Sequence, residues 1–416
     1  MAKATKWGST YKVLLDVGFL ADAFTLDASV LDGTDVLDGS TNFVDITEYV
    51  TNININRGRS TQLDTFPSSS CTIVADDRAA ARYFDPLNTA SEWYSGGTVG
   101  IAPRRKFQVY GGTAGTTAMF TGFVYDLNMD YAEPNLSTAT IVATDALGQL
   151  GQTVLTGFNP SSQLTSARVS AILDRPEVSF STALRNIETG IATCGTVAYE
   201  DATNVLTALQ DVATAEGGRL FVDRSGNLNF DARIAVSFGT AVASFGGTAG
   251  VPIQSLSNVY GAETVLNRVA VQIDGGTASS VASGTASQAE YGIKALSLTG
   301  VPLATDAAGS ALAASLLSRF QDPVVRFSEM DVLLNALTTA QQVTMAGLEI
   351  GDILSVSKQF ATGTPATVTQ NVVVESIRHS VNPSRHMVTI GLGQVQLVLP
   401  FILDTSALDD TDYALQ

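Results

Sequence analysis

The two histidines, His379 and His386, are the residues whose type and spacing come closest to a chemical site. They flank Asn382-Pro383-Ser384, a turn sequence between two apolar stretches. Facing each other across a hairpin, they could share a metal ion, with Glu375 nearby. A zinc site normally needs three or four well-placed ligands, and no cysteine joins these residues. We therefore favour surface or cross-strand packing for both histidines, and predict no metal site.

Two pairs of adjacent acids, Asp76-Asp77 and Asp409-Asp410, are the other candidates for acid–base work or calcium binding. Neither pair shows the spaced ligand pattern of a calcium loop. We interpret the second pair as solvated.

Motifs for nucleophilic catalysis or phosphate binding are absent from the sequence. There is no GxSxG nucleophile elbow and no HExxH metalloprotease helix. Glycine pairs occur at Gly96-Gly97, Gly111-Gly112 and Gly246-Gly247, but none is followed by the Lys-Ser/Thr of a phosphate loop. We interpret these pairs as turns and predict no catalytic residue, no cofactor and no enzymatic activity.

Length and composition indicate a folded protein of several domains. The chain has 416 residues and a mass of 43.5 kDa, and single cores rarely grow beyond about 250–300 residues. It is 45% hydrophobic and only 15% charged, which argues against global disorder. The net charge of −17 repels phosphates, so sequence-specific nucleic-acid binding is not expected. The basic cluster Arg104-Arg105-Lys106 is far short of a binding stripe, and we interpret it as a solvated strand entry.

Neither cysteine usage nor hydrophobic runs indicate secretion or a membrane span. Two cysteines, Cys71 and Cys194, do not make a disulfide framework, and the sequence leaves open whether they meet. The N-terminus lacks the apolar core of a signal peptide. The longest apolar run, near Val395–Leu403, contains Pro400 and is roughly half of the ~20 residues that a membrane helix needs.

Residues 1–155 are predicted to be mostly β, because apolar and polar residues alternate there. In Phe123–Tyr131 the odd positions are apolar and Asp126, Asn128 and Asp130 are polar, which predicts a strand with one solvated face. The same period places further residues inward on other strands: Ile53, Ile55, Phe107, Val109, Ala139, Ile141 and Ala143. The irregular stretch Asp76–Gly97 is long enough to be functional or an interface.

Residues 156–250 are predicted to form a smaller α+β module. A helix is expected at Ala167–Leu173, and a second runs to about Ala215, capped by Asp201 or Thr203. Gly217-Gly218 ends the second helix, and a hairpin follows around Arg224-Ser225-Gly226.

Residues 251–400 are predicted to return to β structure, and residues 401–416 form an acidic tail. Gly275–Gly284 has the composition of a loop, and a helix is expected over Ala307–Phe320. Val372–Val381 and Met387–Leu392 are expected to form a closing hairpin.

Several blocks in a fixed order resemble the tail-tip hub proteins of long-tailed phages, especially minor tail proteins of phages that infect actinobacteria. The blocks are Asp45–Val50, Ile55–Ser60, Ala75–Arg78, Tyr83–Asn88, Ala143–Ala146, Ala167–Asp174, Leu209–Ala213, Glu216–Gly218, Phe221–Gly226, Leu348–Asp352, Val374–His379 and Val388–Leu392. They span residues 45–393, and residues 17–43 resemble an insertion.

The resemblance implies a structural virion protein, a homotrimeric baseplate hub with two β-barrel-like tube domains per chain. Residues 1–155 and 251–400 would be those domains, so three chains would present a pseudo-sixfold ring. The implied partners are a distal tail protein ring, a tape measure protein and other minor tail or fibre proteins, and DNA would pass through the lumen without specific binding. The implied location is the virion tail tip, assembled in the host bacterial cytoplasm.

Two other functions compete with the hub. A carbohydrate-binding adhesin on the tail tip would need exposed aromatic platforms, for which Trp7, Trp93 and Tyr94 are the candidates. A wall-degrading enzyme would need catalytic residues that the sequence does not show. Trp93 and Tyr94 follow the Asp85-Pro86 loop, and we expect them to pack at the mouth of the first barrel instead.

Overall fold

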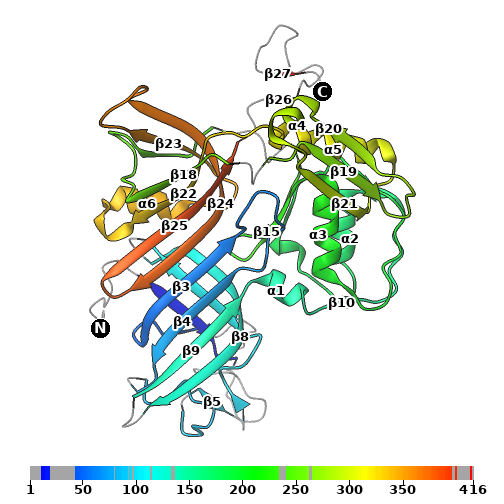
Figure 1. The fold of residues 1–416 in the computed structure, drawn as a ribbon. Coiled ribbons are helices and arrows are strands. Elements are labelled where there is room, and N and C mark those ends of the chain that lie inside the picture. Colours follow the sequence, from blue (N-terminus) through cyan, green and yellow to red (C-terminus); the bar gives the residue numbers. More distant parts are fainter. Residues whose placement is uncertain are drawn as a thin grey trace.

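The computed structural model describes residues 11–18, 43–78, 80–91, 93–95, 98–112, 115–132, 136–233, 240–261, 265–395, 399–400 and 413–414. Strands dominate, as the sequence predicts; in Figure 1 helices α1 to α5 lie to the right of the sheet and α6 lies on its left. The insertion at 17–43 and the acidic tail lie almost wholly outside the described residues. No described helix combines the length and the apolar composition needed to span a bilayer.

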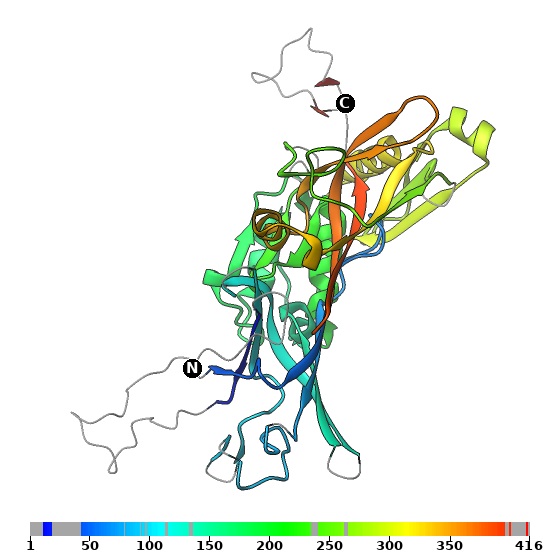
Figure 2. The same cartoon turned by 90° about the vertical axis from the view of Figure 1, so that its left-hand side faces the viewer.

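One long sheet of thirteen strands runs through the molecule, and Figure 2 shows how elongated it is. Its main path is β18-β22-β25-β24-β3-β4-β9-β8-β7-β1-β2, and β23 joins β24 to β17. The strands from the first part of the chain are β1 (Lys12–Asp16), β2 (Phe43–Asp45), β3 (Val50–Gly58), β4 (Ser70–Asp76), β7 (Lys106–Gly111), β8 (Thr117–Ala132) and β9 (Leu136–Thr144). Those from the last part are β17 (Ala243–Gly246), β18 (Ser255–Val259), β22 (Arg326–Leu333), β23 (Ile353–Gln359), β24 (Thr367–Asn382) and β25 (Arg385–Gln394). The described pairings leave β2, β17 and β18 as open ends.

The first core lies against strands from the N-terminal part of the sheet. The alternating residues of β3, β7 and β9 all point into it, so the inward positions predicted from the sequence are confirmed. Phe84 and Trp93 from the irregular stretch 76–97 close this core, with ring centroids 5.0 Å apart. The short strand β5 (Tyr94–Ser95) lies near the end of this stretch and pairs with β6 (Thr98–Val99), just beyond it. The β7–β8 turn follows Gly111, and Gly112 adopts a φ of +84° that favours glycine.

Strand β8 departs from the predicted alternation. Its register against β9 shifts between Val124 and Asp126, where one extra residue is inserted. Before this bulge the even positions, including Val124, are buried, and after it Leu127 and Met129 turn partly inward. The prediction that all the apolar odd positions share a buried face is therefore wrong: Tyr125 lies at the bulge, and both Tyr125 and Tyr131 are exposed.

Strand β24 joins the two ends of the chain into one sheet. Its residues 372–382 pair with β25, as the predicted closing hairpin requires. On its other side, residues 367–373 pair with β23 and residues 376–381 pair with β3. Segments more than 300 residues apart in sequence are thus hydrogen-bonded neighbours, as Figure 1 shows for β3 and β24.

A second core lies under β22, β23, β24 and β25. Its residues come from these strands, from η4 (Leu334–Ala336) and from α6 (Thr339–Gly347). Helix α6 begins at a capping box. The Thr338 hydroxyl accepts a hydrogen bond from the Gln341 backbone N–H, and the Gln341 side-chain oxygen accepts one from the Thr338 backbone N–H.

The middle of the chain forms a separate α+β core beside the long sheet. Its helices are α1 (Ala146–Leu150), α2 (Thr165–Leu173) and α3 (Val205–Glu216), with a short η1 (Thr182–Leu184). Its strands are β10 (Val154–Leu155), β11 (Gln163–Leu164), β12 (Arg185–Ile187), β13 (Thr193–Cys194), β14 (Thr203–Asn204), β15 (Arg219–Val222) and β16 (Leu228–Asp231). Both predicted helices and the predicted hairpin are confirmed.

The cap of helix α3 differs from the prediction. Asn204, not Asp201 or Thr203, is the N-cap, and its side chain accepts a hydrogen bond from the Thr207 N–H. Gly217 ends the helix with a left-handed φ of +68°, as expected.

A fourth cluster packs against the middle module. It contains β19 (Arg268–Ile273), β20 (Ser280–Ser283), β21 (Ala295–Val301), α4 (Thr285–Tyr291) and α5 (Asp306–Phe320). Its core includes Ala192 and Ala215 of the middle module. The helix expected at 307–320 is confirmed, but the loop predicted at 275–284 is not a loop throughout, because β20 pairs there with β19.

The assignment of Asn204 as the N-cap of α3 can be tested by removing the Asn204 side chain. Asn204 also donates to the Gly151 carbonyl at 2.6 Å, so Asn204→Ala loses two hydrogen bonds. We expect the free energy of unfolding to fall by about 1–2 kcal/mol in urea titrations. Asp201→Ala should change it by less than about 0.5 kcal/mol, and an equal loss in both variants would contradict the assignment of the cap.

Candidate functional site

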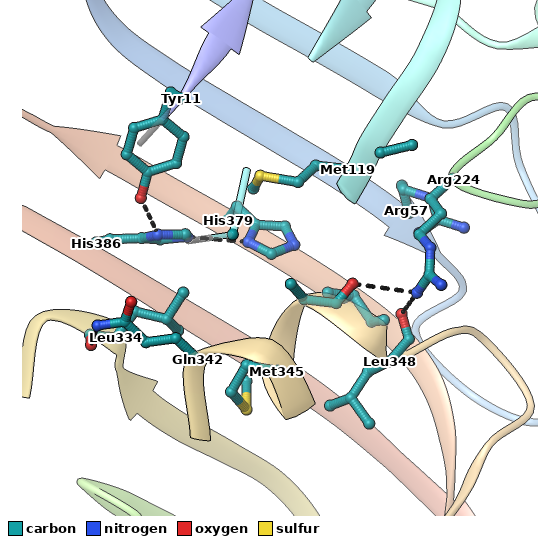
Figure 3. A pocket seen from close by; sticks show the side chains of 14 residues that line it. Tyr11, Arg57, Met119, Arg224, Leu334, Gln342, Met345, Leu348, His379 and His386 are labelled. Atoms are coloured by element: carbon teal, nitrogen blue, oxygen red, sulfur yellow. Dashed lines mark hydrogen bonds between the residues drawn. The ribbon is translucent and has the colours of Figure 1, made fainter. Parts of the chain in front are cut away.

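The two histidines do lie together, but they form a buried hydrogen-bonded chain. His379 Nδ1 and His386 Nε2 are 3.0 Å apart across the β24–β25 hairpin. His386 Nδ1 is hydrogen-bonded to the hydroxyl of Tyr11, next to β1, and its backbone N–H to Asn335. Figure 3 shows this chain at one wall of a small cavity, with Met345 of α6 among the side chains that line it. The chain ties the N-terminal strand to the C-terminal hairpin.

Burial keeps these rings neutral. His386 is 2% exposed, and burial lowers its pKa to about 3. The pKa of His379 is also lowered well below its ordinary value, by burial first and then by His386 and Arg57. Two neutral imidazoles can share one proton in a hydrogen bond, whereas two cations would repel each other.

Glu375 does not join the histidines as a third metal ligand. It occupies the bulge of β24 between Val374 and Ser376, and its Oε2 accepts a hydrogen bond from Arg59 Nε at 2.7 Å. Throughout the described ranges, no three His, Cys, Asp or Glu side chains gather closely enough to hold a metal ion.

Of the acid pair Asp76-Asp77, only Asp77 is buried, and it has a structural role, whereas Asp76 faces outward at 3.9 Å from Arg78. Asp77 is fully buried, its Oδ1 accepts the Phe84 N–H at 3.0 Å, and burial raises its pKa. Asp85 holds the same loop by accepting from Leu87, from Tyr131 and from Arg82, with which it forms an ion pair. Asp409-Asp410 lie outside the described residues.

Other candidates are buried or lie beyond the described chain. Cys71 and Cys194 are free thiols in different cores, so they do not meet. Trp93 is 4% exposed and Tyr94 partly buried, so neither offers a flat exposed platform. Trp7 is not among the described residues.

Three parts of the chain meet at a buried polar junction that the sequence did not reveal. Arg57 of β3 forms an ion pair with Glu349 and donates to the Val222 carbonyl of β15 at 3.4 Å. Glu349 Oε2 also accepts the Arg224 N–H at 2.9 Å. The Arg224 guanidinium in turn donates a hydrogen bond to the carbonyl of Leu348, the residue that ends α6, at 2.9 Å.

The outer face of the long sheet is the main candidate for function. Directly paired residues form a row across seven strands, and every one of them is polar: Ser255, Asp331, Thr389, Arg378, Asn56, Ser70 and Thr144. None of these residues is buried. Directly opposed residues share a face of a sheet, so this row is one surface continuous over both halves of the chain.

This polar face is shallow and acid-rich. Asp331 accepts hydrogen bonds from Ser255 and Thr389, each at 2.6 Å, and the face is hollowed by a depression of about 590 Å³. Strand pairing places these acids on it: Asp76, Asp126, Asp130, Glu329 and Asp331. Arg378 and Arg385 are the bases at paired positions of β24 and β25, and Lys106 of β7 lies on the same face, because it pairs with Phe123, which pairs with Thr144. Such a surface offers hydroxyls, amides and carboxylates to water.

Comparison with known proteins finds similarity in structure and none in sequence families. No family model and no curated protein matches the sequence. The 43 kDa tail protein of prophage MuSo2 from Shewanella oneidensis is similar over 92% of this chain and 98% of its own, with 13% identity and a TM-score of 0.58. The tail protein from Neisseria meningitidis MC58 is similar over 92% and 96%, with 10% identity and a TM-score of 0.56.

A chain of the Francisella PdpA–VgrG complex is also similar, over 95% of this chain and 54% of its own, with 7% identity and a TM-score of 0.50. These similarities show that the chain has the fold of phage tail proteins.

The buried ion pair between Arg59 and Glu375 should matter more than a surface pair. Glu375 is 3% exposed, so Glu375→Ala leaves Arg59 charged, buried and without its carboxylate. We expect a loss of about 3–5 kcal/mol in the free energy of unfolding. Glu329→Ala, which removes the exposed partner of Arg378, should lose no more than about 1 kcal/mol. Equal losses in urea titrations would refute this ranking.

Because burial keeps His386 neutral, we expect the folded protein to lose stability in acid. The pKa of His386 is lower in the folded chain than its ordinary 6.5, so its contribution to stability is present above pH 6.5 and is lost as pH falls toward about 3. The expected slope is up to about 1.4 kcal/mol per pH unit. Burial raises the pKa of Asp145 to about 6, which acts in the opposite direction between pH 4 and 6.

The contribution of His386 to the free energy of unfolding can be isolated by comparing the wild type with His386→Gln. Asp145 is present in both proteins, so its effect on the pH dependence cancels in the difference. The difference between their free energies of unfolding should shrink as pH falls from 7 to 4. A difference that does not vary with pH would show that His386 is not held neutral.

Proposed function

We propose that this chain is a structural subunit of a phage tail, forming a hub at the tail tip. The observation that carries the proposal is the continuous polar face of the long sheet, which both halves of the chain build together. The shared fold over almost the whole length of two tail proteins supports it. The proposed role is mechanical and not catalytic.

The proposed hub is a homotrimer with pseudo-sixfold symmetry. In this arrangement the first tube domain comprises residues 1–155 and the second residues 251–400, with the module 156–250 beside them. The sheet is open in a single chain, with β18 at one end and β2 at the other. Open edges invite pairing with another chain, so neighbouring copies would complete the barrel-like ring.

In the proposed ring the polar face lines the DNA exit path. Its acids outnumber its bases, and hydroxyl and amide groups separate them. A wall of this kind repels the phosphate backbone and offers no string of cations to bind it. DNA would thus pass without specific binding.

The proposed partners follow from a position at the end of the tail tube. A sixfold distal tail protein ring would lie above the hub, with the tape measure protein inside and other minor tail or fibre proteins below. The subunit would be made in the cytoplasm of the host bacterium and function in the virion, and the sequence blocks favour a siphophage of actinobacteria. The adhesin alternative gains no support from Trp93, because that ring is buried.

The trimer is testable in solution. We expect the full chain to show three times its 43.5 kDa in analytical ultracentrifugation, with the trimer fraction rising with concentration. Val259 and Tyr260 are exposed at the β18 edge, and lysines at both positions should reduce the trimer, since charged edges oppose strand pairing. Val281→Lys, at an exposed position of β20, is the matched control. A chain that stays monomeric at high micromolar concentration contradicts the proposal.

A further inference from the structure

A second cavity lies between the middle module and the fourth cluster. It has a volume of about 120 Å³ and is bordered by the loop after β3, the end of α3, and by β21 and α5. Its apolar wall comes from leucines of β21 and α5: Leu296, Leu298, Leu312 and Leu316. Cavities of similar size, about 150 Å³, hold a benzene ring, so this cleft admits one large apolar side chain.

Three arginines also line this cleft: Arg59, Arg219 and Arg319. Arg59 and Arg219 have carboxylate partners in Glu375 and Asp231. Arg219 nevertheless keeps a buried Nη1 with no hydrogen-bond partner.

Arg319 of α5 has no carboxylate partner among the described residues, and its guanidinium lies 5.4 Å from the ring of the adjacent Phe320. Burial lowers its pKa, and the charges of Arg59 and Arg219 add to that effect, while Glu375 opposes it. A cation beside leucines without a counter-charge is unfavourable unless an anion joins it. The cleft is therefore complementary to a group that carries an apolar side chain next to a carboxylate.

The last strand of the long sheet, β25, ends at the edge of the cleft. Gln62, which borders the cleft, donates to the Gln394 carbonyl and accepts from the Gln394 N–H, each at 3.0 Å. Gln394 ends β25, so the last part of the chain starts beside the cleft. Phe401 follows Val395 by six positions, a stretch of chain that can span up to about 20 Å.

The sequence after β25 has the matching chemistry. Phe401-Ile402-Leu403 is followed directly by Asp404, and further acids occur at Asp409, Asp410 and Asp412. Residues 401–416 contain no lysine or arginine. Three consecutive large apolar residues need cover from water. The flanking strands β26 (Leu399–Pro400) and β27 (Tyr413–Ala414) pair with each other and with no other described strand.

We propose that residues 401–404 dock in the cleft of their own chain. One apolar side chain of Phe401–Leu403 fills the space between β21 and α5, and Asp404 pairs with Arg319. Docking would fasten the C-terminal segment across the middle module and the fourth cluster. It would also supply the anion that Arg319 lacks.

The experiment is disulfide trapping in the full chain. Leu316→Cys is combined with Leu403→Cys, and Ala314→Cys with Leu403→Cys is the control, because Ala314 lies on the exposed side of the same helix. The native Cys71 and Cys194 are fully buried and so do not compete. Under mild oxidation we expect the first pair to close within one chain at least about tenfold faster than the control, because docking raises the local concentration. Intact mass and non-reducing gels measure the rate.

A third substitution tests the charge. Arg319→Gln should slow closure several-fold, Arg319→Lys should slow it less, and high salt should act like Arg319→Gln by screening the pair. Leu298→Cys replaces Leu316→Cys if circular dichroism shows that the latter is unfolded.

Two results would overturn the proposal. Equal rates for positions 316 and 314 would mean that the segment does not enter the cleft. Disulfides that form only between chains would mean that the cleft takes the tail of another copy.

Discussion

The pairing of β3 with β24 is the constraint on which the rest of the structure depends. Backbone hydrogen bonds join residues 53–58 to residues 376–381, and every strand on either side takes its position from this seam. Closing a loop of this length has a large entropic cost that no local interaction offsets. The two cores that flank the seam must therefore form together with it, since Val381 of β24 packs in the first core and Ile377 in the second.

Ion pairs stabilise the β3–β24 pairing near the end of β3, and hydrogen bonds between neutral side chains stabilise it further along. Arg57 and Arg59 leave β3 toward Glu349 and Glu375, which belong to the C-terminal half. Such buried pairs are costly to desolvate, so their geometry adds more to specificity of register than to net stability. Further along the same strands, Tyr11, His386 and His379 join the halves without any charge. A one-residue slip of β24 would separate both sets of partners and turn the polar row inward.

The same seam explains the character of the surface. Because both halves enter one sheet in register, their outward residues form one polar face instead of two separate ones. A face of hydroxyls, amides and acids can be built from many sequences, provided the alternation is kept. This is consistent with a tail-protein fold shared at 13% and 10% identity. A surface defined by pattern tolerates substitutions that a catalytic site would not.

Local features of this protein could be predicted from the sequence alone. The alternation in β3, β7 and β9, helix α5 and the turn at Gly217 are set by neighbours a few residues apart, and all agree with the structure. The closeness of His379 and His386 followed from one hairpin for the same reason.

Tertiary structure alone decided what depends on distant partners. The inward face of β8 changes at the Val124–Asp126 bulge because β9 sets its register, and Glu375 turns to Arg59 because β24 lies beside β3. The cap of α3 moved to Asn204, where the Gly151 carbonyl provides a second bond. Periodicity in a sequence specifies which side chains share a face, but the partner of that face is chosen by packing between segments hundreds of residues apart.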